Sequence, residues 1–342
     1  MRNGVVWSLF LIAIFKCTLS VQSHQAILLP SQLRRDSPAS CPAPNPSLYY
    51  RPVIGILSHP GDSSSGSRFS SSTRASYIAA SYVKFVEAAG ARVIPLIYNE
   101  SPEKLQKKLS LVNGVLFTGG WAKSGLYFET VEKIFKKVLE RNDGGDYFPL
   151  YATCLGFELL TMIVSKDNNI LEGFSASNQA SSLQFKENAN LEGTVFQRFP
   201  PDLLKKMSTE CLVMQNHIYA ISPGKFLDNE KLSSFFEILS TCKDENDKVY
   251  VSTVHSRNYP VTGFQWHPEK NTFEWGVPGI PHTEDAIQIT QLAANFLVSE
   301  ARKSLNRPDA QEVRDNLIYN YNPTYTGKDG RGFDEIYIFT PV

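Results

Sequence analysis

The feature that most constrains the fold of this chain is a regular alternation of apolar runs and amphipathic segments that begins near residue 52. The apolar runs are rich in β-branched residues and predict strands at 52–60, 92–98, 114–120 and 147–154. Apolar residues at helical spacing predict helices at 73–90, 101–109, 126–142 and 155–165. Strands that are apolar throughout are covered on both faces. The sequence therefore predicts an α/β fold with a doubly wound, mostly parallel central sheet and helices on both faces.

The second half of the chain has a less regular pattern. Residues 168–200 predict irregular structure with some antiparallel strands, and the alternating runs 248–256 and 260–268 predict an antiparallel pair. A final helix is expected at 283–304, followed by short extended pieces. Neither an internal repeat nor a linker interrupts the chain after residue 51, so residues 50–342 are interpreted as one domain.

The N-terminal region has the composition of a targeting segment. Residues 1–23 combine a basic start, an apolar run too short to span a bilayer comfortably, and small or polar residues after it, which predicts a secretory signal peptide. Residues 24–49 are rich in Ser, Pro and Arg and are interpreted as a flexible lead-in or pro-segment. We therefore expect a protein of the secretory pathway, destined for a vacuole (lysosome-like) or the extracellular space, with no membrane segment after signal removal.

Charge and cysteine content exclude several classes of protein. The formal net charge is +0, which argues against a nucleic-acid binder. The chain has five cysteines but no C-x-x-C pair, so neither a structural zinc site nor another metal site is expected, and no cofactor is expected. A disulfide between Cys211 and Cys242 is left open. Asn99 begins an N-glycosylation sequon, which Pro102 follows closely.

Cys154 lies between a predicted strand and a predicted helix, and two interpretations are open. A lone cysteine is usually a packed core thiol. The alternative is a nucleophile on a sharp strand-to-helix turn, where Gly156 would remove a side chain between strand and helix. The N–H groups and dipole at the start of the helix would stabilise a thiolate, and the N–H of Leu155 would donate to an oxyanion.

His267 and Glu269 end another apolar run. Pro268 stops the strand, and residues two apart in an extended chain point the same way, so Glu269 would orient the imidazole. Together with Cys154 they predict a Cys-His-Glu triad. The alternative is an ordinary His-Pro-Glu turn at the surface.

Gly119 and Gly120 end the strand predicted at 114–120. Carboxyl ends of parallel strands meet at one edge of a sheet, where ligands bind. Without a side chain, Gly119 would allow substrate to approach. Gly120 would offer a second N–H to an oxyanion, and such a donor stabilises the transition state by about 3 kcal/mol. The alternative is a plain turn.

Two further residues are candidates for substrate contact. His217 is either a second histidine of the site or a neutral loop histidine. Glu158 follows Cys154 by one helical turn on the same face, so it is either a substrate contact or a surface acid. The sequence shows no partner for the remaining histidines, namely His24, His59, His255 and His282.

Three motifs, FTGG at 117–120, TCLGFE at 153–158 and GFQWHPEK at 263–270, resemble the class I glutamine amidotransferase-like superfamily. Within it, the chain resembles the γ-glutamyl hydrolase family (peptidase family C26) from about residue 51 to its end. The stretches that carry this resemblance are SYIAASYVKFVEAAGARVIPL (76–96), DYFPLYATCLGFELL (146–160), YPVTGFQWHPEK (259–270) and NPTYTG (322–327).

The resemblance implies a hydrolase for the γ-linked polyglutamate tail of folates. It makes Cys154 the nucleophile, His267 the acid and base, and Glu269 the third triad member, and it matches His217 to a histidine in the substrate cleft. It also suggests a homodimer. Because the tail is polyanionic, cations near the cleft are expected, with positional candidates Arg68, Arg74 and Lys123 and a further contact from Tyr77, which is placed at the start of the first helix.

The chain departs from the superfamily pattern at two positions. Many amidotransferases have Gly where this chain has Ala152, which bears on the geometry of the turn at Cys154. They have Gln where this chain has Glu158, which fits the hydrolase branch. Two alternatives remain: a hydrolase of other γ-glutamyl amides or peptides, and a non-catalytic folate-binding protein.

Overall fold

The computed structural model describes residues 41, 43–61, 75–187, 190–327 and 332–340. The chain divides into a part that ends at Pro46 and a compact unit, Ser47–Val342. The predicted signal peptide and most of the predicted lead-in lie outside the described residues.

The core of the compact unit is an eight-stranded sheet with the order β4-β1-β5-β6-β12-β11-β10-β8. Four of its seven strand pairings, those from β4 to β12, are parallel. The predicted mostly parallel central sheet is therefore confirmed. Its strands are β1 (Val53–Leu57), β4 (Arg92–Leu96), β5 (Gly114–Phe117), β6 (Leu150–Thr153), β8 (Gln184–Phe185), β10 (Phe236–Lys243), β11 (Val249–Ser256) and β12 (Val261–Phe264).

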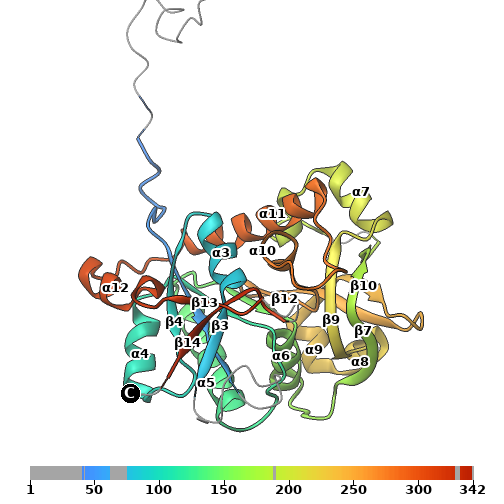
Figure 1. Cartoon of the computed structure of the whole chain (residues 1–342), viewed down its shortest axis with the longest axis horizontal. Coiled ribbons are helices and arrows are strands. Elements are labelled where there is room, and N and C mark those ends of the chain that lie inside the picture. The colour runs from blue at the N-terminus through green and yellow to red at the C-terminus, as the bar shows by residue number, and fades with distance from the viewer. Residues whose placement is uncertain (1–40, 42, 62–74, 188–189, 328–331, 341–342) are drawn as a thin grey trace, which may run out of the picture. The chain divides into compact units, whose positions relative to one another are not determined.

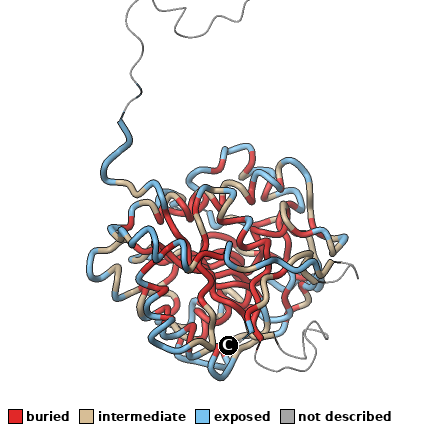
Figure 2. The backbone as a smooth tube through the Cα atoms, turned by 60° about the vertical axis from the view of Figure 1, so that its left-hand side comes forward, coloured by how far each residue is buried: buried red, intermediate tan, exposed pale blue. Residues whose placement is uncertain are grey.

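Both faces of this sheet are covered, as the apolar strands require. Along β1, Val53 and Leu57 belong to one apolar cluster, whereas Ile54 and Ile56 belong to the other. The first cluster includes residues of α4 (Pro102–Ser110), α5 (Gly125–Asp143), α6 (Leu155–Ser165), α8 (Pro223–Asp228), α9 (Glu230–Phe235) and α12 (Ala310–Asn316). The second includes residues of α3 (Ala80–Ala88), η2 (Val195–Arg198), α7 (Pro201–Thr209), α11 (Glu284–Ala301) and η3 (Ile318–Asn320). Figure 2 shows the buried backbone concentrated between these layers.

Two smaller sheets flank the central one. The first has the order β13-β14-β3-β2, and the second pairs β7 with β9 antiparallel. Their strands are β2 (His59–Pro60), β3 (Ser76–Ala79), β7 (Glu172–Ser181), β9 (Val213–Ala220), β13 (Pro323–Tyr325) and β14 (Glu335–Phe339). In Figure 1, β3 lies beside β14, which comes from the C-terminal end of the chain.

The structure corrects the helix predicted at 73–90. Residues 76–79 form β3, and helix α3 begins only at Ala80. The cause is distant in sequence, because β3 pairs antiparallel with both β14 and β2. Tyr77 is therefore a strand residue and does not open the first helix.

Two elements predicted for the second half of the chain are present in the structure. The antiparallel pair β11–β12 and the long helix near the C-terminus, α11, are confirmed. A disulfide between Cys211 and Cys242 is not formed: both are free thiols, Cys211 exposed and Cys242 buried with its Sγ 3.3 Å from the Ser182 carbonyl oxygen. Among the described residues, no helix is both long and apolar enough to cross a membrane.

Candidate active site

The candidate site is formed where three neighbouring parallel strands end. Strands β5, β6 and β12 lie side by side in that order. Gly119 and Gly120 follow the first, Cys154 follows the second, and His267 follows the third. The structure thus brings together the residues that the sequence placed at one edge of the sheet, with the cysteine in the middle.

Cys154 occupies a sharp turn between β6 and α6. Its backbone has φ 51° and ψ −107°, a conformation that L-residues rarely adopt. The turn is held by the Cys154 N–H, which donates to the Phe264 carbonyl oxygen over 2.6 Å, and by the Gly156 N–H, which donates to the Thr118 carbonyl oxygen over 3.2 Å. A Cβ at Gly156 would lie 2.9 Å from the Phe117 carbonyl oxygen, so the packing of strand against helix needs glycine there. The turn forms although Ala152 replaces the glycine of many amidotransferases.

The Cys154 thiol is buried and protonated. Its Sγ lies 3.8 Å from the carbonyl oxygen of Asn216, to which it donates. Burial raises the pKa of the thiol, and the Glu158 carboxylate raises it further, against an opposing effect of Lys123. The thiol therefore needs a base that removes its proton before the sulfur can attack.

His267 provides a nitrogen that suits this task. Its Nδ1 lies 2.7 Å from Glu269 Oε1, so Nδ1 carries the hydrogen and Nε2 keeps its lone pair. Nε2 is buried and has no hydrogen-bond partner among the described residues. Burial lowers the pKa of His267, and Glu269 partly offsets this effect. Burial alone would raise the pKa of the Glu269 carboxyl. The opposing effect of His267 is larger, so that pKa is lowered and the carboxyl stays ionised.

Gly119 is the residue that Cys154 and His267 both border. A Cβ at Gly119 would lie 2.8 Å from His267 Cε1 and 3.5 Å from Cys154 Cβ, so the two side chains meet over this glycine. Tyr82, which the sequence analysis did not single out, completes the group. Its hydroxyl accepts a hydrogen bond from the Gly119 N–H over 2.8 Å and lies 3.4 Å from His267 Nδ1.

Two backbone N–H groups are available to an oxyanion at this site. Leu155 is the first residue of α6, so its N–H has no acceptor within the helix. Gly120 lines the cavity, and its N–H makes no hydrogen bond in the part of the chain that the structure describes. The two donors that the sequence indicated are therefore next to Cys154 in the chain and at the wall of the cavity that Cys154 lines.

A cavity of about 210 Å³ opens onto the thiol. It is lined by Tyr77, Gly119, Gly120, Trp121, Cys154, Asn216, His267, Lys270 and Phe333. Tyr77 thus reaches the site from β3. Lys270 is buried, and its ammonium lies 4.9 Å from the centre of the Phe333 ring, so the cavity holds a cation that the sequence analysis did not select.

Buried Glu158 and half-buried Lys123 form an ion pair near the thiol. Their charged groups are 2.9 Å apart, and Gln265 donates a second hydrogen bond to Glu158 over 3.3 Å. Burial raises the pKa of Glu158, although Lys123 opposes this effect. Lys123 was one of three cations proposed by position, whereas Arg68 and Arg74 lie outside the described residues.

His217 lies on β9 with its ring edge-on to Tyr250. Its Nδ1 donates to the Tyr219 carbonyl oxygen over 3.0 Å, and its buried Nε2 has no partner among the described residues. Burial and the nearby His267 lower the pKa of His217 to about 3. The ring is therefore neutral and presents an unused hydrogen-bond acceptor close to the triad.

His59 is the residue that sequence reasoning most clearly missed. It was set aside for want of a partner, yet it is buried and its Nε2 accepts hydrogen bonds from the N–H groups of Trp121 and Ala122, each over 3.2 Å. Its position at the end of the first apolar run, on the same edge of the sheet as Gly120, was the one available signal.

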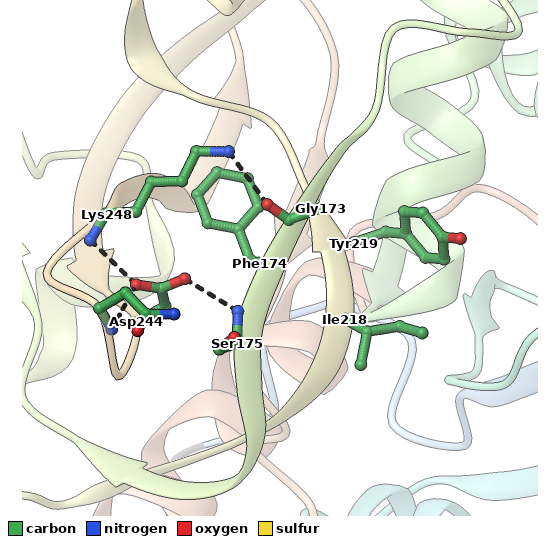
Figure 3. A pocket seen from close by; sticks show the side chains of 8 residues that line it. Gly173, Phe174, Ser175, Ile218, Tyr219, Asp244 and Lys248 are labelled. Carbon is green, nitrogen blue, oxygen red and sulfur yellow. Dashed lines mark hydrogen bonds between the residues drawn. The ribbon is translucent and has the colours of Figure 1, made fainter.

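A second pocket, of about 390 Å³, lies over β7 and β9 and contains no comparable group of reactive side chains (Figure 3). Its acid, Asp244, accepts hydrogen bonds from the N–H groups of Ser175 and Lys248 over 2.8 and 2.9 Å. These bonds outweigh burial and lower the pKa of Asp244. The carboxylate closes a turn and is not poised to transfer a proton.

Comparison with known proteins identifies the family of the chain. The Peptidase C26 family matches residues 52–269. The chain is 65% identical to "Gamma-glutamyl hydrolase 2" of Arabidopsis thaliana over 98% of this chain and 97% of the relative, and 40% identical to "Gamma-glutamyl hydrolase" of Bos taurus over 87% and 92%. Among solved structures, a glutamine amidotransferase from Thermotoga maritima matches with a TM-score of 0.41 and 13% identity, over 74% of this chain and 99% of the other.

Proposed function

Because the chain belongs to the peptidase C26 family of cysteine-type hydrolases, we propose that it hydrolyses γ-glutamyl bonds of folyl poly-γ-glutamates through Cys154, His267 and Glu269. One observation carries this proposal: a buried thiol lines the same cavity as an imidazole whose Nε2 has no protein partner in the described residues and whose Nδ1 is held by a carboxylate. That arrangement suits nucleophilic attack on an amide carbonyl.

In the first half of the reaction, His267 Nε2 takes the thiol proton as Cys154 Sγ forms a bond to the γ-carbonyl carbon. The carbonyl oxygen becomes an oxyanion that the N–H groups of Leu155 and Gly120 stabilise. Glu269 stabilises the imidazolium through Nδ1. The C–N bond then breaks, and the leaving amine takes the proton from Nε2, which leaves a γ-glutamyl thioester on Cys154.

In the second half, water enters the position that the amine has left. His267 Nε2 accepts a proton from this water, whose oxygen attacks the thioester carbonyl. The C–S bond breaks, the sulfur takes the proton back from His267, and the γ-carboxylic acid is released. The same imidazole therefore serves as base and then as acid in each half.

The charges of the cavity suit a substrate that carries a carboxylate on every glutamate. Lys270 is buried at the cavity wall, and Lys123 lies near the thiol, where it pairs with Glu158. An ammonium in a buried site gains from a carboxylate partner, because that partner compensates for lost hydration. We assign the α-carboxylates of the polyglutamate tail to these two lysines.

The test uses purified protein and its Cys154→Ala variant with pteroylpentaglutamate, and mass spectrometry follows the length of the glutamate chain. We expect the wild type to shorten the chain and the variant to leave it intact. A wild type that leaves pteroylpentaglutamate intact but cleaves γ-glutamyl dipeptides would move the substrate to other γ-glutamyl amides. A variant as fast as the wild type would refute the assigned nucleophile.

The N-terminal sequence supports a further proposal, that the chain enters the secretory pathway and reaches a vacuole or the extracellular space, and the family resemblance supports a homodimer. Expression of the full chain with a C-terminal fluorescent protein tests the route, and deletion of residues 1–23 should retain the fusion in the cytosol. Analytical ultracentrifugation of the secreted form tests the dimer, which a sedimenting mass near that of one chain would contradict.

A further inference from the structure

His59 holds the loop that carries the oxyanion donor Gly120. The residue lies at the start of β2, and its side chain is buried. Its Nδ1 is 2.8 Å from the Pro60 carbonyl oxygen, an acceptor, so Nδ1 carries the ring hydrogen. Nε2 therefore has a lone pair, and the N–H groups of Trp121 and Ala122 both donate to it over 3.2 Å.

The hydrogen bonds of the loop 119–122 single out one N–H. The Gly119 N–H donates to the Tyr82 hydroxyl, and those of Trp121 and Ala122 donate to His59. Gly120 lies between these anchored groups, lines the cavity, and has an N–H without an acceptor in the described residues. Three hydrogen bonds to two side chains thus leave a single donor of this loop for the substrate.

The loop and the ring are also in direct contact. A Cβ at Gly120 would overlap His59 Cδ2 and Nε2, so the backbone rests on the imidazole itself. The ring is held in place by the side chains of Trp121, Tyr127 and Tyr77, whose ring centres lie 4.2, 5.0 and 5.6 Å away. Enclosed in this way, the imidazole holds the peptide unit between Gly120 and Trp121, which is the unit directly after the one that carries the Gly120 N–H.

We propose that neutral His59 is a positioning residue that aims the Gly120 N–H at the oxyanion. The proposal rests on the proposed function, which assigns that N–H to the tetrahedral intermediate. His59 is not among the residues that line the cavity at Cys154. It acts through two hydrogen bonds that the loop donates to Nε2 of His59. Only the neutral ring can accept them, because in an imidazolium Nε2 also carries a hydrogen and would face the N–H groups of Trp121 and Ala122 as a donor.

The role predicts a loss confined to the transition state. Loss of one oxyanion donor lowers kcat by about 10²–10³-fold in comparable enzymes. An interaction made only in the transition state changes kcat and leaves KM nearly unchanged. Loss of the His59 acceptor also leaves two N–H groups to find water or move, and either event turns the neighbouring peptide.

The experiment compares three variants in the full enzyme with pteroylpentaglutamate. His59→Gln keeps an uncharged acceptor near the position of Nε2. His59→Leu keeps the volume without an acceptor, and His59→Asn is polar but too short to reach the loop. We expect kcat to fall about 10²-fold in the Leu and Asn variants with similar KM, and His59→Gln to recover most of the loss. Two variants without the acceptor keep the test valid if one fails to fold.

A second measurement separates aiming from general packing. A pteroylglutamate analogue with an aldehyde in place of the γ-carboxyl adds the Cys154 thiol across its C=O, so that sulfur bonds to carbon and the oxygen occupies the oxyanion position. The matching alcohol binds without reaction. His59→Leu should lose aldehyde affinity in proportion to kcat and keep its affinity for the alcohol. Alkylation of Cys154 by iodoacetamide, which displaces iodide, should proceed at the wild-type rate.

Two results would overturn the proposal. One is a His59→Gln variant as slow as His59→Leu, and the other is an equal loss of affinity for aldehyde and alcohol. A wild type that does not cleave pteroylpentaglutamate, although its Cys154 is alkylated normally, would instead refute the proposed substrate. The two failures are therefore distinguishable in the same set of assays.

Discussion

His267 donates a hydrogen bond through Nδ1 to Glu269 Oε1 over 2.7 Å, and both side chains are buried. Burial alone would lower the pKa of the imidazole strongly, and the carboxylate limits that fall. Glu269 therefore has two effects on one ring: it fixes which nitrogen carries the hydrogen, and it makes the other nitrogen a stronger base.

Glu269→Gln should separate these effects. The amide can donate to Nδ1 and so favour the wrong tautomer, which lowers kcat by roughly 10²–10⁴-fold in comparable triads. The imidazole must be neutral to act as a base. Because burial lowers its pKa, the acid limb of kcat/KM in the wild type should lie below the ordinary histidine value of about 6.5. Without the carboxylate that pKa falls further, so the limb should move to lower pH in the variant.

Glu274→Gln is the matched control for this prediction. Glu274 lies one residue beyond the short helix α10 (Lys270–Phe273) and accepts a hydrogen bond from the Asp334 N–H over 2.8 Å. Burial raises its pKa to about 7, so a neutral amide is a close substitute. Its kcat should stay near that of the wild type. An acid limb that stays in place in Glu269→Gln would show that Glu269 does not influence the titration of His267.

Gly119→Ala should disable the enzyme without unfolding it. The new methyl group would lie 2.8 Å from His267 Cε1 and 3.0 Å from the Tyr82 hydroxyl, and both are side chains that can shift. A displacement of the base by about 1 Å costs on the order of 10²-fold in rate. Steady-state kinetics and a melting curve measure the two effects separately.

Gly224→Ala is the control for the glycine substitution. Gly224 lies in α8, and a Cβ there meets nothing within 4 Å. It should keep full activity and stabilise the fold by roughly 0.5–1 kcal/mol, as alanine does in a helix. Equal activity in both alanine variants would mean that Gly119 does not separate His267 from Cys154.

The placement of the triad was predictable because it depends on local patterns alone. Apolar runs identify the strands, and parallel strands end at one edge, so residues just after three runs meet there. Strand order then follows from topology, with β6 and its Cys154 between β5 and β12. What the pattern could not provide was the distance between Cys154 and His267, which depends on a glycine at 119.

The residues that sequence reasoning missed act through contacts remote in the chain. His59 bonds to N–H groups 62 and 63 residues away, and Tyr82 bonds to one 37 residues away. Neither forms a motif with its partners. The helix predicted at 73–90 was wrong at its start for a similar reason, because the pairing of β3 with β14 overrides a local helical pattern.

Cys154→Gly should be more stable than Cys154→Ala, although both lack the nucleophile. Glycine usually costs stability relative to alanine, but the backbone of residue 154 has φ 51° and ψ −107°, where any Cβ is strained. We expect a difference in the free energy of unfolding of about 1 kcal/mol in favour of glycine. Chemical denaturation of the two inactive variants measures it.

Ala152→Gly should change the free energy of unfolding in the opposite direction, at a position two residues before Cys154. Ala152 is buried in regular strand β6, where it pairs with Phe117 and Gly263. Glycine there should lower the free energy of unfolding by roughly 0.5–1 kcal/mol. If Cys154→Gly were destabilised to the same degree, the turn would carry no strain for a side chain.

The neutral state of His217 makes the fold sensitive to acid. The pKa of His217 is about 3 in the folded protein, because burial and the nearby His267 lower it, against about 6.5 when the chain is unfolded. Between these values the unfolded chain binds a proton that the folded chain does not, so the free energy of unfolding falls as pH decreases through this window. From pH 6 to pH 4 this one group contributes a loss of about 2 kcal/mol.

His217→Gln removes that titration and should flatten the pH dependence. Because the substitution also changes packing around residue 217, the informative quantity is the change in the free energy of unfolding between pH 6 and pH 4, measured by urea denaturation. Cys211→Ser, at an exposed thiol, serves as the control and should follow the wild type. Parallel curves for His217→Gln and the wild type would mean that folding does not lower the pKa of His217.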